Sequence, residues 1–159
     1  MTALHITTEI EAPIDRVFDL SRSIDLHIGS QSTHRERAVA GRTSGLITLG
    51  ETVTWSAVHF GIRQRLTTRI SAMEPPHFFR DSQERGIFKR FDHDHLFEHE
   101  NGITVMTDVF DFDAPLGPLG RLAERLVLKR YMTRLLGERN TMIKTAAETD
   151  LWQRFLSNG

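Results

Sequence analysis

The sequence contains no cysteine among its 159 residues. This absence excludes a disulfide framework, a zinc site built on thiolates and catalysis by a thiol. No apolar run approaches the roughly 20 residues that a membrane-spanning helix needs. Residues 1–10 also lack the basic and apolar regions of a secretory signal. We therefore expect a cytoplasmic protein with no stable membrane insertion.

An excess of charge of one sign is also absent. The chain has 20 Lys and Arg residues against 21 Asp and Glu residues, for a formal net charge of -1. It therefore lacks the basic surplus that is typical of nucleic-acid-binding proteins, and we expect no nucleic-acid partner. The 39% of hydrophobic and 26% of charged residues are ordinary for a globular protein, and the length suits one domain with one core.

Alternating hydrophobicity and turn signals predict a largely antiparallel β-structure with two short helices near the N-terminus. Residues 4–11 predict the first strand. Pro13 favours the start of a helix, where its missing N–H needs no partner, and a second short helix is predicted within 23–29. Six more strands are predicted at 33–40, 51–60, 62–73, 77–83, 87–98 and 103–112. Asn101 and Gly102 favour a tight hairpin turn before the last strand.

After residue 115 the hydrophobic period changes from that of strands to that of a helix. We predict one long helix from about 117 to 149, about 50 Å long at ~1.5 Å per residue. The sheet must bury its apolar face against this helix, and antiparallel strands of such length twist and curve. The predicted fold class is therefore α+β, with one domain over 1–149. Residues 150–159 form a tail that extends the helix, docks on the domain or contacts a partner.

The alternation of side chains along strands predicts which residues face the interior. It places aromatic and polar side chains together in a mostly apolar cavity, which is typical of small-molecule sites. The predicted ligand-binding residues on the strands are Trp55, His59, Phe91, His93, His95, Phe97, Met106, Asp108 and Phe110. Arg139 lies near the apolar stripe of the long helix, so we expect it to point inward and pair with a carboxylate or a ligand's acid group. The same alternation places Phe88 on the outer, charged face.

Several stretches, in this order, resemble a known superfamily. They are Ala12–Leu20, Ala40–Gly45, Gly50–Trp55, His59–Gly61, Pro75–Asp81, Gly86–Phe88, His93–His95, and Thr104, Met106 and Asp108 on the last strand. Together they are similar to the START-like or SRPBCC superfamily of ligand-binding and polyketide cyclase/dehydrase-like proteins, and within it to a bacterial group of unknown ligand. The resemblance runs to about Thr149 and implies the helix-grip fold, in which a curved sheet of about seven strands wraps around a C-terminal helix.

The resemblance implies a range of functions, because members of the superfamily include lipid carriers, hormone receptors and aromatase/cyclases. Our first hypothesis is a protein that binds or carries a small apolar or amphipathic molecule, without a cofactor. The second is a cofactor-free cyclase, dehydratase or isomerase, with His93, His95 and Asp108 as candidate catalytic residues. The third is a protein-interaction module, and a homodimer is also open. The sequence favours binding over enzymatic activity.

A metal site is the remaining alternative. His93 and His95 lie on one face of a predicted strand, about 7 Å apart at two residues' rise. His59 or Asp108 on a neighbouring strand could complete a site of three or four ligands for zinc or iron. A His-x-His pattern arises easily by chance in a chain with eight histidines, and the resemblance implies no metal. We therefore expect none.

Overall fold

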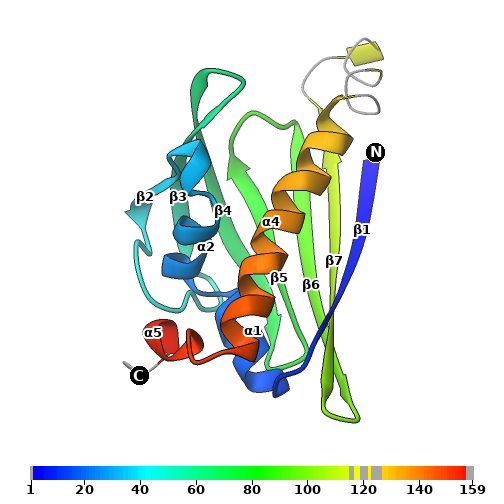
Figure 1. The fold of residues 1–159 in the computed structure, drawn as a ribbon. Helices are drawn as coiled ribbons and strands as arrows, with labels where there is room; N and C mark the ends of the chain where they lie inside the picture. The colour runs from blue at the N-terminus through cyan, green and yellow to red at the C-terminus, as the bar shows by residue number, and fades with distance from the viewer. Residues whose placement is uncertain (1, 115–116, 119–121, 123–126, 157–159) are drawn as a thin grey trace.

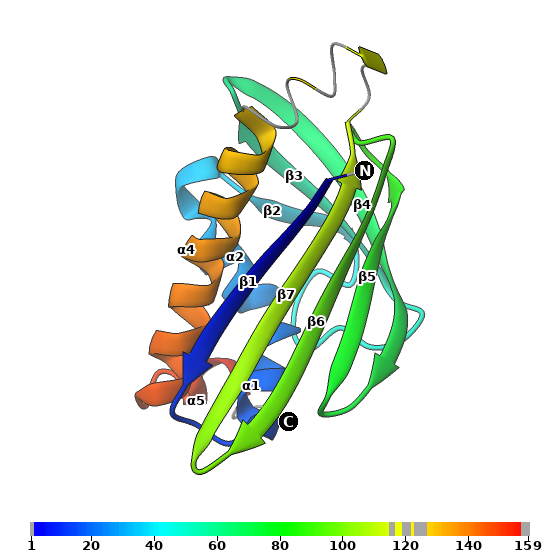
Figure 2. The ribbon, with the colours of Figure 1, turned by 90° about the vertical axis from the view of Figure 1, so that its right-hand side faces the viewer.

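The computed structural model describes residues 2–114, 117–118, 122 and 127–156. The described elements, in chain order, are β1 (Thr2–Ile10), α1 (Ile14–Ser21), α2 (Ile24–Ser30), the 3₁₀ turn η1 (Ser32–His34), β2 (Arg37–Gly41), β3 (Thr52–His59), β4 (Ile62–Glu74), β5 (Phe78–Arg85), β6 (Arg90–Glu100), β7 (Ile103–Asp113), α4 (Lys129–Glu148) and α5 (Trp152–Leu156). All strand pairs are antiparallel, in the order β1-β7-β6-β5-β4-β3-β2. Figure 1 shows α4 crossing this sheet, and Figure 2 shows the sheet curving around the helix. The predicted α+β helix-grip fold is confirmed.

The two short helices form where the sequence predicts them. Pro13 stands at the N-cap of α1, and the hydroxyl of Ser23 caps α2 by accepting a hydrogen bond from the backbone N–H of Leu26 at 3.2 Å. Helix α1 buries Val17 and Phe18 against the sheet and α4. Helix α1 lies at the end of α4 that is drawn in red-orange in Figure 1, and α2 lies beside the middle of α4, so together they close one end of the grip.

Buried side chains form two apolar clusters. The larger lies at the end closed by the short helices, with Phe18 and Ile143 among its members. The smaller is aromatic and includes Phe91, Phe110 and Phe112. Along β6 and β7 the clusters are separated by polar residues that are themselves buried, namely His93, His95 and Asp108. A polar layer therefore crosses the interior of the protein.

Three local predictions differ from the structure. Residues 33–36 are not strand, because the chain makes the turn η1 there and Arg35 adopts a positive φ of 52°. Strand β6 begins at Arg90 and not at residue 87, so the alternation does not apply to Phe88. Phe88 instead packs inward on the aromatic cluster, which makes its predicted outward orientation wrong. Most of the predicted helix between 117 and 128 lies outside the described residues, and α4 is described from Lys129.

The tail does not extend α4. The helix ends at Glu148, its C-cap Thr149 has an extended backbone, and the chain continues as the separate short helix α5. The guanidinium of Arg16 lies over the ring of Trp152 at 4.3 Å, and Phe155 packs on the larger cluster. Residues 150–156 therefore dock on the domain, and residues 157–159 lie outside the described residues.

Two glycines give a matched test of backbone constraint. Gly41 and Gly45 share a φ of +73°, which disfavours any side chain. A Cβ at Gly41 would lie 2.3 Å from the carbonyl oxygen of Thr52, whereas one at Gly45 would meet nothing within 4 Å. We expect Gly45→Ala to lower the free energy of unfolding by about 1 kcal/mol. Gly41→Ala should cost roughly 1–3 kcal/mol more, because the strands must part. Equal losses in urea unfolding would contradict this account.

Candidate functional site

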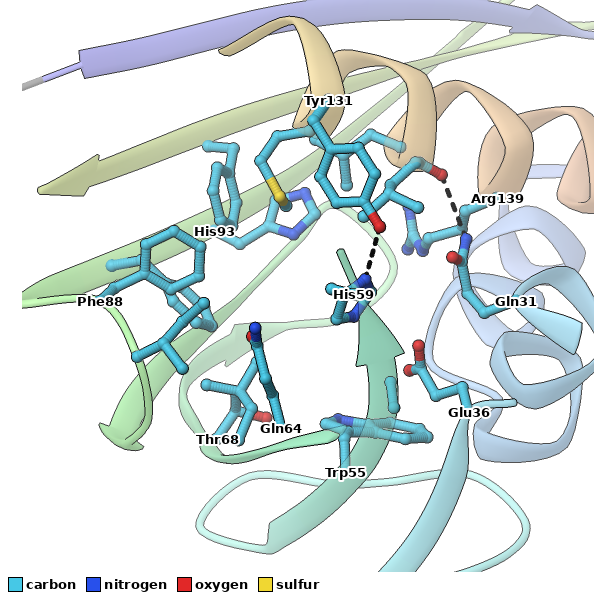
Figure 3. A pocket seen from close by; sticks show the side chains of 18 of the residues that line it. Gln31, Glu36, Trp55, His59, Gln64, Thr68, Phe88, His93, Tyr131 and Arg139 are labelled. Carbon is cyan, nitrogen blue, oxygen red and sulfur yellow. Dashed lines mark hydrogen bonds between the residues drawn. The ribbon is translucent and has the colours of Figure 1, made fainter. Parts of the chain in front are cut away.

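A cavity opens between the sheet and α4, beside the polar layer. Side chains from β3, β4, β5, β6 and β7 form its floor, and α2 and α4 form its sides. Water molecules can reach about 170 Å³ of space in this cavity. A cavity needs only roughly 10–15 Å³ to hold a single water, so this one has room for a larger molecule. Its apolar lining includes Trp55, Leu66, Phe88, Phe91, Phe110, Met132 and Leu136. Figure 3 shows Phe88 and His93 at the left of the cavity, Gln64 and Trp55 below it and Arg139 at the right.

The polar layer is built by the register of three adjacent strands. On β5 and β6, Asp81 stands opposite His93, and on β6 and β7, His95 stands opposite Asp108. Each histidine forms its hydrogen bond with the carboxylate that lies diagonally across from it on the neighbouring strand, a distance that long side chains can span. The Nε2 atom of His93 lies 2.7 Å from Asp108 Oδ1, and the Nε2 atom of His95 lies 2.7 Å from Asp81 Oδ2. The two imidazole rings consequently lie with their centres 3.8 Å apart, closer than the sequence predicts.

Helix α4 completes the layer from the opposite side. Arg139 donates from Nη1 to Asp108 Oδ1 at 3.3 Å, and Asn140 donates from Nδ2 to Asp108 Oδ2 at 2.7 Å. Arg139 also donates from Nη1 to Asn140 Oδ1 and from Nη2 to the carbonyl of Ser21. Asp108, which is fully buried, is thus held by three groups from two elements. The prediction that Arg139 points inward toward a carboxylate is confirmed.

The charges of this layer are set by mutual pairing. Burial alone would raise the pKa of Asp108, but the hydrogen bond from His93, the neighbouring ring of His95 and the charge of Arg139 hold the pKa well below its usual range. Burial, followed by the neighbouring His95, lowers the pKa of His93 despite the carboxylates of Asp108 and Asp81. Burial would also raise the pKa of Asp81, yet its hydrogen bond with His95 and its interactions with His93, His95 and Arg139 lower it. Both carboxylates are therefore ionised and His93 is neutral at neutral pH.

The hydrogen-bond partners assign a proton to each ring. Because His93 is neutral and its Nε2 donates to Asp108, its Nδ1 carries a lone pair, 3.9 Å from Asp81 Oδ2. Arg139 Nη2 donates to His95 Nδ1 at 3.2 Å, so Nε2 of His95 carries the proton that goes to Asp81. His93 and Asp81 both line the cavity. The layer therefore presents hydrogen-bond acceptors to whatever enters.

The opposite part of the cavity is bordered by a polar bridge between β3 and α4. His59 Nδ1 and the hydroxyl of Tyr131 share a hydrogen bond of 2.6 Å, visible in Figure 3. Burial lowers the pKa of His59 and raises that of Tyr131, so both are neutral at neutral pH. Phe60 packs on Tyr131 with ring centres 4.6 Å apart and is itself 59% exposed. His59 therefore belongs to the bridge and not to the polar layer, where the sequence analysis considered it as a metal ligand.

The structure brings most of the predicted residues to the cavity but not all. Those that line it are Trp55, His59, Phe91, His93, Phe110 and Arg139, and His95 lines the adjoining smaller hollow beside the polar layer. Phe97 and Met106 are packed inside the larger cluster and lie outside both linings. Asp108 acts from behind His93 and has no exposed surface.

Several lining residues were not predicted from the sequence, and two of them, Asp81 and Tyr131, take part in the polar groups described above. Asp81 lies two residues after the buried Phe79 on β5 and so faces the same side of the sheet, which means that the alternation of side chains would have placed it inside. Tyr131 lies on α4 one to two turns before Leu136 and Arg139, on the side that faces β3. Its position depends on how α4 lies across the sheet, which no local pattern specifies.

The interaction of Asp108 with Arg139 can be tested by a double-mutant cycle. We expect Asp108→Leu or Arg139→Leu alone to lower the free energy of unfolding by about 3–5 kcal/mol, because each leaves a buried charge unpaired. The double variant should lose much less than the sum of the two single losses, since neither charge then remains. Urea unfolding followed by circular dichroism measures all four proteins. Additive losses would show that the two side chains do not stabilise one another.

The fold of the chain was compared with those of known proteins. No family model matches the chain, and no curated protein matches its sequence significantly. Solved structures do match. The Zhui aromatase/cyclase from a Streptomyces species has a TM-score of 0.74 at 14% identity, over 99% of this chain and 98% of its own. TTHA0849 from Thermus thermophilus has a TM-score of 0.71 at 18% identity, over 92% of this chain and 99% of its own.

A plant protein also has a similar fold. The ginseng major latex-like protein 151 from Panax ginseng has a TM-score of 0.65 at 14% identity, over 93% of this chain and 98% of its own. Within the part of the chain that the structure describes, no helix is long and apolar enough to cross a membrane. At these identities the likeness establishes the fold alone. The chain therefore has the START-like helix-grip fold.

Proposed function

We propose that the protein binds a small, mostly apolar molecule in the cavity between the sheet and α4. The observation that carries the proposal is a roomy cavity with aromatic walls that ends on a buried layer of fixed hydrogen-bonding groups. Apolar walls with a few convergent polar groups are typical of small-molecule sites. The aromatase/cyclase and latex-like structures named above have the same fold, which supports a ligand-binding or cyclase-like protein.

The polar layer favours one kind of polar group on the ligand. His93 and the carboxylate of Asp81 offer acceptors and line the cavity, whereas the Nη1 and Nη2 donors of Arg139 are engaged by Asp108, Asn140, Ser21 and His95. A hydroxyl can donate to these acceptors, and a carboxylate would be repelled by Asp81. We therefore favour an aromatic ligand with a hydroxyl at one end over an acid, which differs from the expectation that Arg139 meets a ligand's acid group.

Matched fluorescent probes test this preference. We expect 2-naphthol to bind about tenfold or more tightly than 2-naphthoate, because a hydrogen bond to a charged acceptor contributes roughly 1.5–3 kcal/mol. 2-Methoxynaphthalene, which lacks the donor, should also bind more weakly than 2-naphthol. Fluorescence titration measures all three. Preferential binding of 2-naphthoate would show that the polar end is an acid-binding site.

Filling the cavity tests where the probe binds. Gln64 on β4 lines the cavity, so Gln64→Trp should place an indole in it and weaken 2-naphthol binding at least tenfold. Ser71→Trp, at an exposed position of the same strand, is the matched control and should bind as the wild type does. If Gln64→Trp binds 2-naphthol normally while remaining folded, the ligand does not occupy this cavity. Native mass spectrometry of the purified protein would add the identity of any retained ligand.

The hydrogen bond from His93 to Asp108 favours general-base catalysis as a second candidate function. A buried carboxylate that accepts the Nε2 proton fixes the ring and stabilises the imidazolium that forms when Nδ1 takes a proton. Such a base would serve a cyclisation, dehydration or isomerisation of a bound aromatic compound. Asp108 then acts as a positioning residue and His93 as the catalytic one.

General-base activity can be measured without knowledge of the substrate, by using an aromatic compound whose reaction needs only that a base remove a proton from carbon. We expect the protein to accelerate ring opening of 5-nitrobenzisoxazole, and His93→Gln to lower the rate about 100-fold, as is typical for loss of a general base. His99→Gln alters a histidine on the same face of β6 but at its exposed end, and should leave the rate unchanged. A wild-type rate no faster than that of His93→Gln would leave binding without catalysis.

A further inference from the structure

We propose that Asp81, His93 and His95 form a binding site for a divalent transition-metal ion, zinc in the first instance, at the inner end of the cavity. One ligand atom from each residue lies within 4.8 Å of the other two. The proposal is independent of the organic ligand, because metal binding can be measured without one. It differs from the arrangement considered on sequence grounds, since Asp81 provides the carboxylate.

The spacing of the three atoms is close to what a metal requires. Two ligand atoms of a tetrahedral zinc ion lie about 3.3 Å apart, given bonds of about 2.0–2.1 Å. Asp81 Oδ2 lies 2.7 Å from His95 Nε2 and 3.9 Å from His93 Nδ1. These two distances lie on either side of the required value, and all three atoms lie within 4.8 Å of one another. Side-chain movements of about 1 Å or less therefore bring them to the spacing that the ion needs. Two imidazoles and one carboxylate are also a ligand set that suits zinc and ferrous iron.

Asp108 provides the second element of the site. Metal-binding histidines usually donate their other ring N–H to a carboxylate or carbonyl, which fixes the tautomer and the ring orientation. Asp108 Oδ1 lies 2.7 Å from His93 Nε2 and 3.3 Å from His95 Nδ1. One buried carboxylate can therefore accept from the far nitrogen of both rings, with Nδ1 of His93 and Nε2 of His95 left for the metal. This arrangement is specific, because both far nitrogens meet the same oxygen atom.

Binding the ion requires one proton to move. In the metal-free protein His95 Nε2 carries the proton that goes to Asp81. With metal bound, the proton must be on His95 Nδ1, where Asp108 accepts it, and Arg139 then turns fully to Asp108, Asn140 and Ser21. Asp81 and Asp108 together carry two negative charges against one positive charge on Arg139. The divalent ion therefore enters a site of net negative charge.

The fourth position of the metal would face the cavity. Asp81 and His93 line the main cavity, and all three ligands line the hollow that adjoins it. A site with three protein ligands and one open position is typical of zinc that binds water or substrate, in contrast to closed structural sites. A hydroxyl group of a bound aromatic molecule would reach the ion directly. Metal and general base are mutually exclusive here, because both use the lone pair of His93 Nδ1.

Titration of the chelator-treated protein with Zn²⁺ by calorimetry, and with Co²⁺ by visible absorption, tests the proposal. We expect one ion per chain and the strong absorption that Co²⁺ shows in a four-coordinate site. Asp81→Asn, His93→Gln and His95→Gln should each abolish saturable binding. Asp108→Asn should weaken it about 10–100-fold, the usual effect of losing an outer partner of a ligand. His99→Gln and Asp94→Asn, on the same strand, should bind as the wild type does.

The possible outcomes separate this proposal from the proposed function. Absence of one-to-one binding in the wild type would overturn it, as would unchanged binding in Asp81→Asn and His93→Gln, which would place the ion on other histidines. Circular dichroism identifies any variant that fails to fold, and Asp81, the least buried ligand, is the variant least exposed to that risk. Binding of 2-naphthol in the presence of chelator reports on the cavity alone, so either idea can fail without the other.

Discussion

The position of α4 across the sheet depends on one buried charge, that of Asp108. An ionised carboxylate without solvent contact must be fully paired, and its partners come from β6 and from α4. Replacing such a network by apolar side chains is often neutral or stabilising, so its presence does not by itself account for stability. What it does is restrict geometry, because α4 must lie where Arg139 and Asn140 can both reach Asp108. The network thereby fixes the helix that forms one wall of the cavity.

The same polar layer explains why a cavity forms on one side of it. At one end, α1 and α2 supply side chains to the larger cluster, which fills the space between sheet and helix except for the smaller hollow. At the other end no short helix contributes to the aromatic cluster among the described residues. Phe91 and Phe110 therefore face open space that α4 alone does not fill. The polar layer becomes the inner wall of that space.

The sequence was sufficient for the fold and for the composition of the interior, because both depend on local periodicity. The alternation along β6 and β7 correctly placed His93, His95 and Asp108 inside. It was insufficient for contacts that depend on strand register and helix position. Asp81 meets His95 only because β5 pairs with β6 in one particular register. Tyr131 meets His59 through the placement of α4, and Phe88 turns inward because β6 begins later than its apolar pattern suggests.

The lone pair on His93 Nδ1 is the feature on which all the proposed chemistry depends. It can accept a hydrogen bond from a ligand, take a proton from a substrate or bind a metal ion, but it can do only one of these at a time. In each case Asp108 has the same task, which is to accept the Nε2 proton and hold the ring in place. Changes among the residues around Nδ1 can therefore alter the chemistry without altering the buried network or the position of α4. This separation of scaffold from reacting atom gives a physical reason why one fold can serve binding proteins and enzymes alike.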